Sequence, residues 1–400
     1  MIKNFFIYFF NFIKIYKIND KIKKKNKSKI NIIFQIEHKG QFQFIINLLS
    51  RVLEDKKYNK ILISSNNDLD FLRKKISNTK ILIVKTNISY HIKNVDICVK
   101  CNFEDTKPKN SISIYIGHGF LGKRNFIPKK YFEDINHIFL YGPSYFKLMK
   151  YYIRNARYNF KKLRFWKVGY PNYDDQINNV YNISKIKKKL NITNNKINVL
   201  YSPSWENNAS LRSNSKNIIK IFSKLTKYNF IIKLHPTLLI KKESKSYKFY
   251  TGGINWHKKF IFFEKKYSNI YYYKELKINP LFKIAKIMIT DFSSVGLGFM
   301  LENKPVIFYN QKNLINNNLI SLGYDKHLEK NPLINNGMNY GLKINNICDI
   351  SFSINFLIKN KKFYLKKSKN LKKNLLYNPG KASELYYKYL NRIIDSEIKL

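Results

Sequence analysis

The sequence has few cysteines, few acidic residues and no long apolar run near its start. Its three cysteines are Cys98, Cys101 and Cys348, and so sparse and odd a set excludes a disulfide framework and fits a reducing cytosol. Cys98 and Cys101 have the spacing of a redox or zinc pair, but no second Cys or His pair lies nearby. We therefore interpret them as structural residues.

The shortage of acidic residues makes the chain strongly basic. Asp and Glu number 25 against 75 Lys and Arg, a formal charge of +50. Such a charge favours an anionic partner, which could be nucleic acid, acidic lipid or a phosphorylated substrate. The excess is nearly all lysine and is spread along the whole chain, which indicates a compositional bias. We therefore expect no nucleic-acid partner, but attraction to an anionic membrane surface.

The first 29 residues have the pattern of a membrane-associating segment. The longest apolar run there, Phe5 to Phe10, is far shorter than the ~20 residues of a membrane span. Polar residues share one helical stripe and aromatic residues another, the latter being Phe5, Phe9, Phe12 and Tyr16. This pattern predicts a helix in the membrane interface, with the lysines of residues 17–29 adding attraction to anionic lipid. The alternative is a helix packed on the protein's own surface.

The remaining chain alternates short β-branched runs with helical stretches. This alternation predicts α/β domains with parallel, doubly wound sheets. The pattern restarts after an Asn- and Lys-rich linker near residues 178–198, so we expect two similar halves around a cleft. The expected divisions are a first Rossmann-like acceptor domain (30–178), a second Rossmann-like donor-nucleotide domain (198–378) and a C-terminal helix (379–400).

The stretch from Lys286 to Tyr309 is the most informative. It predicts a strand, a helix from Val295 to Leu301 and a second strand from Val306. Four polar residues stand between the first strand and the helix, namely Thr290, Asp291, Ser293 and Ser294. Ligands of parallel sheets bind beyond the carboxyl ends of strands, and a helix N-terminus there favours a phosphate. An ordinary capped helix is the alternative.

Five further strand exits have polar or Gly-rich residues. They are Glu37-His38-Lys39-Gly40, Gly117-His118-Gly119, Gly169-Tyr170-Pro171-Asn172, Pro203-Ser204-Trp205 and His235-Pro236. Together and in this order, the six exits resemble the CDP-glycerol glycerophosphotransferase family, the teichoic-acid primases and polymerases. The resemblance covers roughly Ile112 to Tyr309. It implies a GT-B-like fold of two Rossmann-like halves facing a central cleft.

The resemblance also implies an activity. Enzymes of this family transfer glycerol phosphate, or a similar polyol phosphate, from a CDP-activated donor to a hydroxyl of a membrane-linked polymer precursor, and CMP is released. On this basis we expect a peripheral enzyme at the cytoplasmic face of the cell membrane. We expect no cofactor and no metal, because helix dipoles and cationic groups can stabilise the diphosphate.

The resemblance assigns roles to individual residues. His118 matches the family's first-domain histidine and would act as general base or orient the acceptor, although Gly117 stands where the family has Trp. His235 would donate to the diphosphate as CMP leaves. Donor binding would fall to Ser204, Trp205, Thr290, Asp291, Ser293 and Ser294, and acceptor binding to Gly117, Gly119, Glu37 and His38. Glu206 departs from the family, where a basic residue commonly follows the Trp.

Other functions remain open at this point. One is a GT-B glycosyltransferase that uses a nucleotide sugar and attacks the sugar carbon. Another is a non-catalytic basic protein that binds membrane or nucleic acid. A third, sugar-nucleotide 2-epimerisation, requires a carboxylate-rich cleft that the sequence does not indicate.

Overall fold

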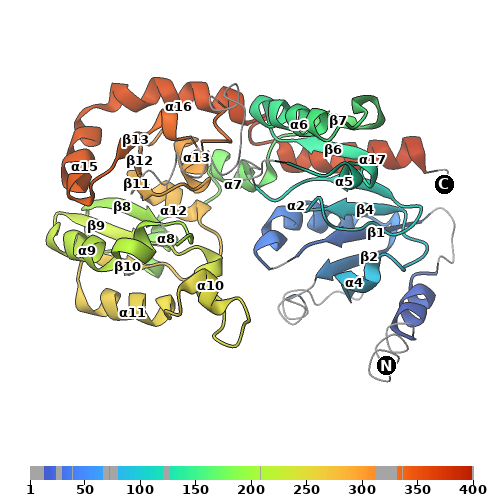
Figure 1. The fold of residues 1–400 in the computed structure, drawn as a ribbon, viewed down its shortest axis with the longest axis horizontal. Helices are drawn as coiled ribbons and strands as arrows, with labels where there is room; N and C mark the ends of the chain where they lie inside the picture. Colours follow the sequence, from blue (N-terminus) through green and yellow to red (C-terminus); the bar gives the residue numbers. More distant parts are fainter. Residues whose placement is uncertain are drawn as a thin grey trace.

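The computed structural model describes residues 13–398 except 24–28, 38, 66–71, 73–79, 120–125, 208, 311–330 and 336. The chain forms two α/β halves side by side, each built on one parallel sheet (Figure 1). This confirms the predicted fold class. The sequence also predicts a helix over Leu69–Ile76, a range that falls almost wholly outside the described residues.

The first half contains a seven-stranded sheet in the order β3-β2-β1-β4-β5-β6-β7. Its strands are β1 (Ile30–Gln35), β2 (Tyr58–Ser65), β3 (Ile81–Lys85), β4 (Ile97–Lys100), β5 (Ile112–Tyr115), β6 (His137–Leu140) and β7 (Arg164–Lys167). Its helices are α2 (Phe42–Glu54), α4 (Thr86–Ser89), α5 (Lys129–Glu133), α6 (Pro143–Asn155) and α7 (Asp174–Ile177), with 3-10 turns at Lys39–Gln41, Phe160–Lys162 and Pro171–Tyr173. The next helix, α8 (Ile183–Lys189), packs against α12 (Asn279–Ile284) of the second half (Figure 1). All six residues of β1 are buried, because helices cover both faces of a parallel sheet.

The second half contains a six-stranded parallel sheet in the order β10-β9-β8-β11-β12-β13. Its strands are β8 (Ile197–Ser202), β9 (Tyr228–Ile232), β10 (Ile270–Tyr272), β11 (Ile287–Thr290), β12 (Val306–Tyr309) and β13 (Leu342–Ile344). Its helices are α9 (Ser210–Lys224), α10 (Tyr247–Thr251), α11 (Trp256–Lys266), α12 (Asn279–Ile284), α13 (Val295–Met300), α15 (Ile350–Lys359) and α16 (Lys361–Leu375), with 3-10 turns at Pro236–Leu239, Met338–Tyr340 and Ile347–Asp349.

Strand order places the candidate residues. In each sheet the winding direction reverses once, between β1 and β4 in the first half and between β8 and β11 in the second. Ligands of open α/β sheets bind in the crevice beyond the carboxyl ends of strands at such a reversal. In the second half, this crevice is flanked by the loop after Ser202 and the loop after Thr290, two residues paired across the strands.

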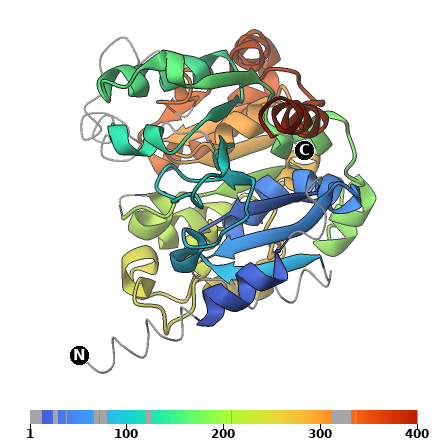
Figure 2. The same ribbon diagram turned by 90° about the vertical axis from the view of Figure 1, so that its right-hand side faces the viewer.

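The last helix returns to the first half. After α16 the chain crosses over, and α17 (Ala382–Glu397) packs its buried face into the core of the first sheet (Figures 1 and 2). At the crossing, Tyr377 N–H donates to the Tyr141 carbonyl over 2.7 Å. A Cβ at Gly142 would lie 2.1 Å from the Leu375 carbonyl oxygen, so only glycine permits this approach.

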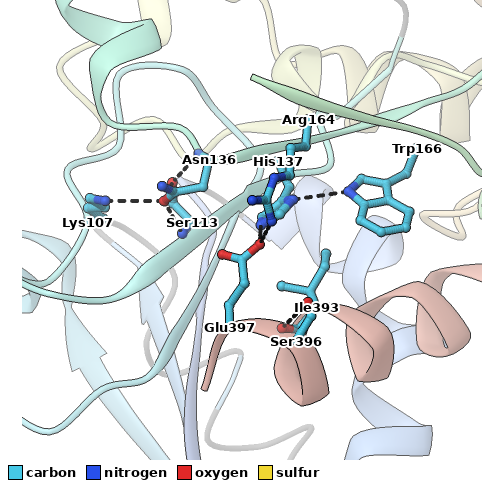
Figure 3. Close-up of polar contacts among 9 residues, drawn as sticks. All are labelled: Lys107, Ser113, Asn136, His137, Arg164, Trp166, Ile393, Ser396 and Glu397. Atoms are coloured by element: carbon cyan, nitrogen blue, oxygen red, sulfur yellow. Dashed lines mark hydrogen bonds and ion pairs between the residues drawn. The ribbon is translucent and has the colours of Figure 1, made fainter. Parts of the chain in front are cut away.

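A buried histidine holds the end of α17. Figure 3 shows the His137 ring between Trp166, whose indole N–H donates to Nδ1 over 3.1 Å, and Glu397, whose Oε1 lies 3.1 Å from Nε2. Arg164 contacts the same carboxylate oxygen. Because Nδ1 accepts, the neutral ring has its proton on Nε2, toward Glu397. Burial lowers the pKa of His137, although Glu397 opposes this shift. The sequence offered no role for His137, and this contact is a structural one.

Three features of the second half differ from the sequence expectations. The sequence from Ile350 to Leu375 predicts a long amphipathic region, and the structure forms two helices there, because Asn360 between them has φ −107° and ψ 60°. The sequence predicts a helix from Ser215 to Lys227, whereas α9 begins at Ser210, ends at Lys224 and contains a kink at Asn214. Helices α10 and α11 and the short edge strand β13 were not predicted, because frequent lysines interrupt their apolar periodicity.

The described part of the N-terminal segment packs on the protein. Residues 13–21 are helical, and Ile15, Ile18 and Ile22 join the apolar cluster beside β1 and β2. Tyr16, from the predicted aromatic face, is 69% exposed. The other three aromatic residues of that face precede residue 13 and lie outside the described range. Within the described chain, no helix combines the length and the apolar character needed to cross a bilayer.

Candidate active site at the strand ends

Asp291 organises the strand ends of the second half. It follows β11 directly and is 1% exposed. Its Oδ2 accepts the backbone N–H of Ser204 over 2.9 Å, and its Oδ1 accepts that of Ser210 over 3.1 Å. Burial raises the pKa of Asp291 to about 6, while these hydrogen bonds oppose the shift. The carboxylate therefore ties the loop after β8 to the loop after β11.

The hydroxyl residues around Asp291 have different surroundings. Thr290 is fully buried, and its Oγ1 donates to the Ser202 carbonyl over 2.6 Å, so this hydroxyl joins the two strands. Ser293 is 9% exposed, and Ser294 is half-buried at the N-cap of α13 without a capping side-chain hydrogen bond. Ser293 and Ser294 are thus better placed than Thr290 to meet a ligand.

The loop after β8 contains Ser204, Trp205 and Glu206. Ser204 Oγ contacts the Glu206 carboxylate. Trp205 is half-buried against two aromatic rings of α10, with centroids 5.9 Å away at Phe249 and 5.0 Å away at Tyr250. Glu206, the acidic residue that departs from the family pattern, therefore accepts the hydrogen bond of the Ser204 hydroxyl.

His235 lies at the exit of the neighbouring strand β9, as N-cap of the Pro236–Leu239 turn. Its Nδ1 accepts the backbone N–H of Thr237 over 3.3 Å and lies 2.7 Å from the Thr237 hydroxyl. A ring whose Nδ1 accepts has its proton on Nε2 when neutral, so Nε2 is a hydrogen-bond donor. Two residues before it, Lys233 is 3% exposed, and burial lowers its pKa to about 8.

His118 lies at the exit of β5 in the first half and has the opposite tautomer. Its Nδ1 lies 2.9 Å from the Cys101 carbonyl oxygen, which can only accept. The proton is therefore on Nδ1, and in the neutral ring Nε2 holds the lone pair. Gly117 and Gly119 have φ values of +67° and +95°, and a Cβ at Gly117 would lie 2.7 Å from the Tyr141 hydroxyl. Both glycines are thus required to turn the chain around His118.

A buried polar network supports the carbonyl that orients His118. Asp105 accepts both the backbone N–H of Asn102 over 3.2 Å and its side-chain amide over 3.1 Å. The Asn102 amide pairs in turn with Gln41, whose Oε1 accepts the Glu37 backbone N–H over 2.7 Å. Burial raises the pKa of Asp105 to about 6. The network joins the exits of β1 and β4, at the reversal point of the first sheet.

Sequence reasoning missed this network. Asn, Gln and Asp are common in loops, and these residues become neighbours only when parallel strands align their exits. Of the predicted acceptor residues, Glu37 is exposed at the end of β1, and His38 lies outside the described range. Cys98 and Cys101 are buried free thiols, as expected of structural residues.

The two halves meet between the His118 loop and α13. The His118 ring packs edge-on against Phe44 at 6.4 Å, Phe44 stacks on Tyr170, and Tyr170 packs on Tyr173. A Cβ at Gly298, on α13, would lie 2.6 Å from the Tyr173 hydroxyl. The exits of the first sheet therefore pack against the helix that follows Ser294.

Polar contacts extend this junction. Gln176 donates to the Gly298 carbonyl over 2.9 Å, and Asn279 donates to the Asn172 carbonyl and to Gln176. In the part of the chain that the structure describes, no group of three or more His, Cys, Asp or Glu side chains could hold a metal ion.

Comparison with known proteins finds a match to one family. The family described as CDP-Glycerol:Poly(glycerophosphate) glycerophosphotransferase matches residues 131–313, a range that includes Ser204, His235 and Asp291. The match covers slightly less than half of the chain. His118 precedes the matched range, so its assignment depends on the structure and the sequence resemblance together.

One curated relative agrees with the family match. The chain is 26% identical over 196 residues to the teichoic acid poly(glycerol phosphate) polymerase of Bacillus spizizenii. This alignment spans 47% of the chain and 43% of the relative, so less than half of that relative is matched.

Two solved structures show the same fold. The wall teichoic acid polymerase TagF matches with a TM-score of 0.65 at 14% identity, over 100% of both chains. UDP-GlcNAc 2-epimerase from Neisseria meningitidis, bound to UDP-GlcNAc, matches with a TM-score of 0.54 at 12% identity, over 91% of this chain and 100% of the other. Two parallel-sheet halves are thus shared by proteins of different activity.

Proposed function

We propose that this protein transfers glycerol phosphate from CDP-glycerol to a hydroxyl of a poly(glycerophosphate) acceptor on a membrane-linked precursor. In the proposed step, the acceptor oxygen attacks the β-phosphorus of the donor. The new P–O bond replaces the pyrophosphate bond, CMP leaves, and the proton of the acceptor hydroxyl passes to a base. The family match supports the donor class, since the matched range contains the proposed donor-binding residues.

The observation that supports the mechanism most directly is the pair of opposite histidine tautomers. With Nδ1 protonated against the Cys101 carbonyl, His118 has a basic Nε2 suited to take the acceptor proton. With Nδ1 accepting from Thr237, His235 presents an Nε2–H suited to donate to the diphosphate of the leaving CMP. Ser293, Ser294 and the amides of the following turn would hold the donor phosphates, while Asp291 positions the Ser204 loop.

The tautomers suggest a test that separates the two roles. A glutamine amide can donate a hydrogen bond but cannot act as a base. His235→Gln should therefore retain more CMP release than His235→Ala, whereas His118→Gln should be as inactive as His118→Ala. We expect each alanine variant to lose about 10²–10⁴-fold in kcat, the usual range for acid–base and oxyanion groups.

The assay measures CMP released from CDP-glycerol with a glycerol phosphate oligomer as acceptor, beside nucleotide sugars as alternative donors. His257→Ala is the matched control, because this exposed histidine contacts only Tyr272 among the contacts described for it, over 3.2 Å. A wild-type protein that turns over a nucleotide sugar but not CDP-glycerol would favour the glycosyltransferase. Unchanged turnover in all the His118 and His235 variants would remove both proposed roles.

We also propose that the protein acts at the cytoplasmic face of the cell membrane. The formal charge of +50 favours an anionic surface, and the acceptor class is membrane-linked. Co-sedimentation with anionic vesicles, weakened by salt and absent with neutral vesicles, would support this placement. Equal recovery in the supernatant with both vesicle types would contradict it.

A further inference from the structure

Lysine is concentrated on α16, far along the chain from the candidate active site. Seven of the 15 residues of this helix are lysines, and the chain contains no acidic residue between Ile350 and Ser383. The buried face of the helix is formed by Tyr364, Ser368, Leu371 and Leu375, so the lysines face outward. Seven lysines in 15 residues exceed the average of the whole chain, which has 75 Lys and Arg in 400 residues.

Four of these lysines line one hollow. It has a volume of about 450 Å³ and is lined by Lys366, Lys369, Asn370, Lys372, Lys373 and Asn303. Spacings of three and four residues put Lys366, Lys369 and Lys373 along one stripe of the helix. The two asparagine amides add neutral N–H donors, so the lining offers hydrogen-bond donors suited to oxyanions.

The hollow has no internal counter-charge. Over the described ranges, none of its four lysine side chains forms an ion pair or a side-chain hydrogen bond. Glu302, beside Asn303, is engaged by Lys283 at 2.8 Å. Like charges three and four residues apart destabilise a helix, and a bound anion would relieve this repulsion.

We propose that the α16 hollow binds phosphodiester groups of the polyanionic acceptor chain, away from the transfer site. This inference rests on the proposed function. None of the lining residues is apolar, so the hollow lacks the groups that insert into a bilayer. It also lacks the aromatic platforms typical of single-stranded nucleic-acid sites. Lysine suits phosphodiesters as a point charge on a flexible side chain.

The hollow lies close to the proposed donor site. Asn303 follows the C-terminal end of α13, whose N-terminal end has Ser294 of the proposed donor site. The two sites therefore lie at opposite ends of one short helix, of the order of 10 Å long for six residues. A chain held at the hollow stays near the transfer site after each addition, which raises the effective concentration of its growing end.

The test compares two matched triple variants. One is Lys366→Gln, Lys369→Gln and Lys373→Gln on α16. The other is Lys258→Gln, Lys265→Gln and Lys266→Gln on α11, which lies on the opposite side of the second half from α16 (Figure 1). Both remove three exposed charges, so they lower non-specific attraction equally. The probe is a fluorescent glycerol phosphate oligomer, titrated without donor at two salt concentrations.

We expect the α16 variant to bind the oligomer about tenfold or more weakly, with a shallower salt dependence, and the α11 variant to stay near wild type. In the transfer assay the α16 variant should lose turnover on long acceptors and keep it on a single-unit acceptor. Equal weakening in both variants would overturn the proposal. So would loss of binding to anionic vesicles or RNA, but not to the oligomer, in the α16 variant alone. A wild type without transfer activity would contradict the proposed function, while the binding titration would still decide this site.

Discussion

At the residue scale, Asp291 combines deep burial with two charge-assisted hydrogen bonds. Burial keeps its folded-state pKa near 6, above the ~3.9 of an exposed aspartate. The native state therefore binds the extra proton between about pH 4 and pH 6, and the free energy of unfolding falls as pH rises through that window. Ionisation of the buried Asp291 carboxyl therefore lowers the free energy of unfolding, although the hydrogen bonds that the carboxylate accepts from Ser204 and Ser210 offset part of this loss.

Asp291→Asn should destabilise the protein by about 1–3 kcal/mol, because an amide cannot accept both backbone N–H groups. The loss should be larger at pH 5 than at pH 7.5, because only the wild type loses stability on deprotonation of this carboxyl. Urea unfolding at both pH values measures the difference. Asp349→Asn, which removes an exposed carboxylate, is the control, and a loss for Asp291→Asn that is equal at both pH values would disprove the raised pKa.

Asn102 supports the carbonyl that orients His118 and does not itself contact the ring. Asn102→Ala should lower kcat, by up to the order of 10²-fold, with little change in the KM for CDP-glycerol, because a misplaced base affects the reaction more than donor binding. The Asn102→Ala, His118→Ala double variant should be no slower than His118→Ala alone. Additive losses in steady-state kinetics would mean that Asn102 acts independently of His118.

At the element scale, α13 is both the helix behind the donor serines and a contact between the halves. Its two glycines, Gly296 and Gly298, each weaken the helix by roughly 1 kcal/mol relative to Ala. Close approach explains both of them. A Cβ at Gly296 would lie 2.9 Å from Phe308, and one at Gly298 would meet Tyr173 of the other half.

Gly298→Ala should therefore destabilise the protein, by about 1–3 kcal/mol for overpacking, despite the better helix propensity of Ala. Tyr173→Leu removes the ring that the new methyl group would strike. In a double-mutant cycle followed by thermal unfolding, the two changes together should cost less than the sum of the single changes. A double variant that shows the full sum would place the strain elsewhere than at this junction.

At the scale of the whole molecule, α17 joins the end of the chain to its beginning. Leu390 is fully buried among strands of the first sheet, and Asp174 accepts the backbone N–H groups of Ala382 and Ser383 at the start of the helix. Figure 3 shows the other end held by Glu397. The first sheet therefore depends on residues more than 200 positions away.

Leu390→Ala should cost about 2–5 kcal/mol, the range for a buried leucine. Hydrogen exchange should show the loss of protection first in β1 and β4 rather than in β8 and β11, since α17 packs on the first sheet. Phe352→Ala, at a position that is 73% exposed, should change neither sheet measurably. Faster exchange in both sheets to the same extent would mean that the halves unfold as one unit.

Local sequence predicts the strands and the helix of the candidate site, but not the chemical roles of its residues. The Ile287–Thr290 strand, the helix from Val295 and the strand from Val306 follow from apolar runs and polar starts, and the structure confirms all three. Ser204, His235 and Asp291 were predicted as strand-exit residues and lie at adjacent strand ends. Their assigned chemical roles stay predictions.

The sequence by itself determined the class of fold and the strand-exit loops, because burial on both sheet faces demands continuous apolar runs and leaves polar residues to the turns. Only the tertiary structure decided which nitrogen of His118 and His235 holds the proton, since that depends on a Cys101 carbonyl and a Thr237 amide placed by the fold. The Asp105–Asn102–Gln41 network, the Gly298 contact and the return of α17 also join residues far apart in the chain. Local patterns describe a residue's own neighbours, whereas hydrogen bonding and packing across strands depend on which segments the sheet order brings together.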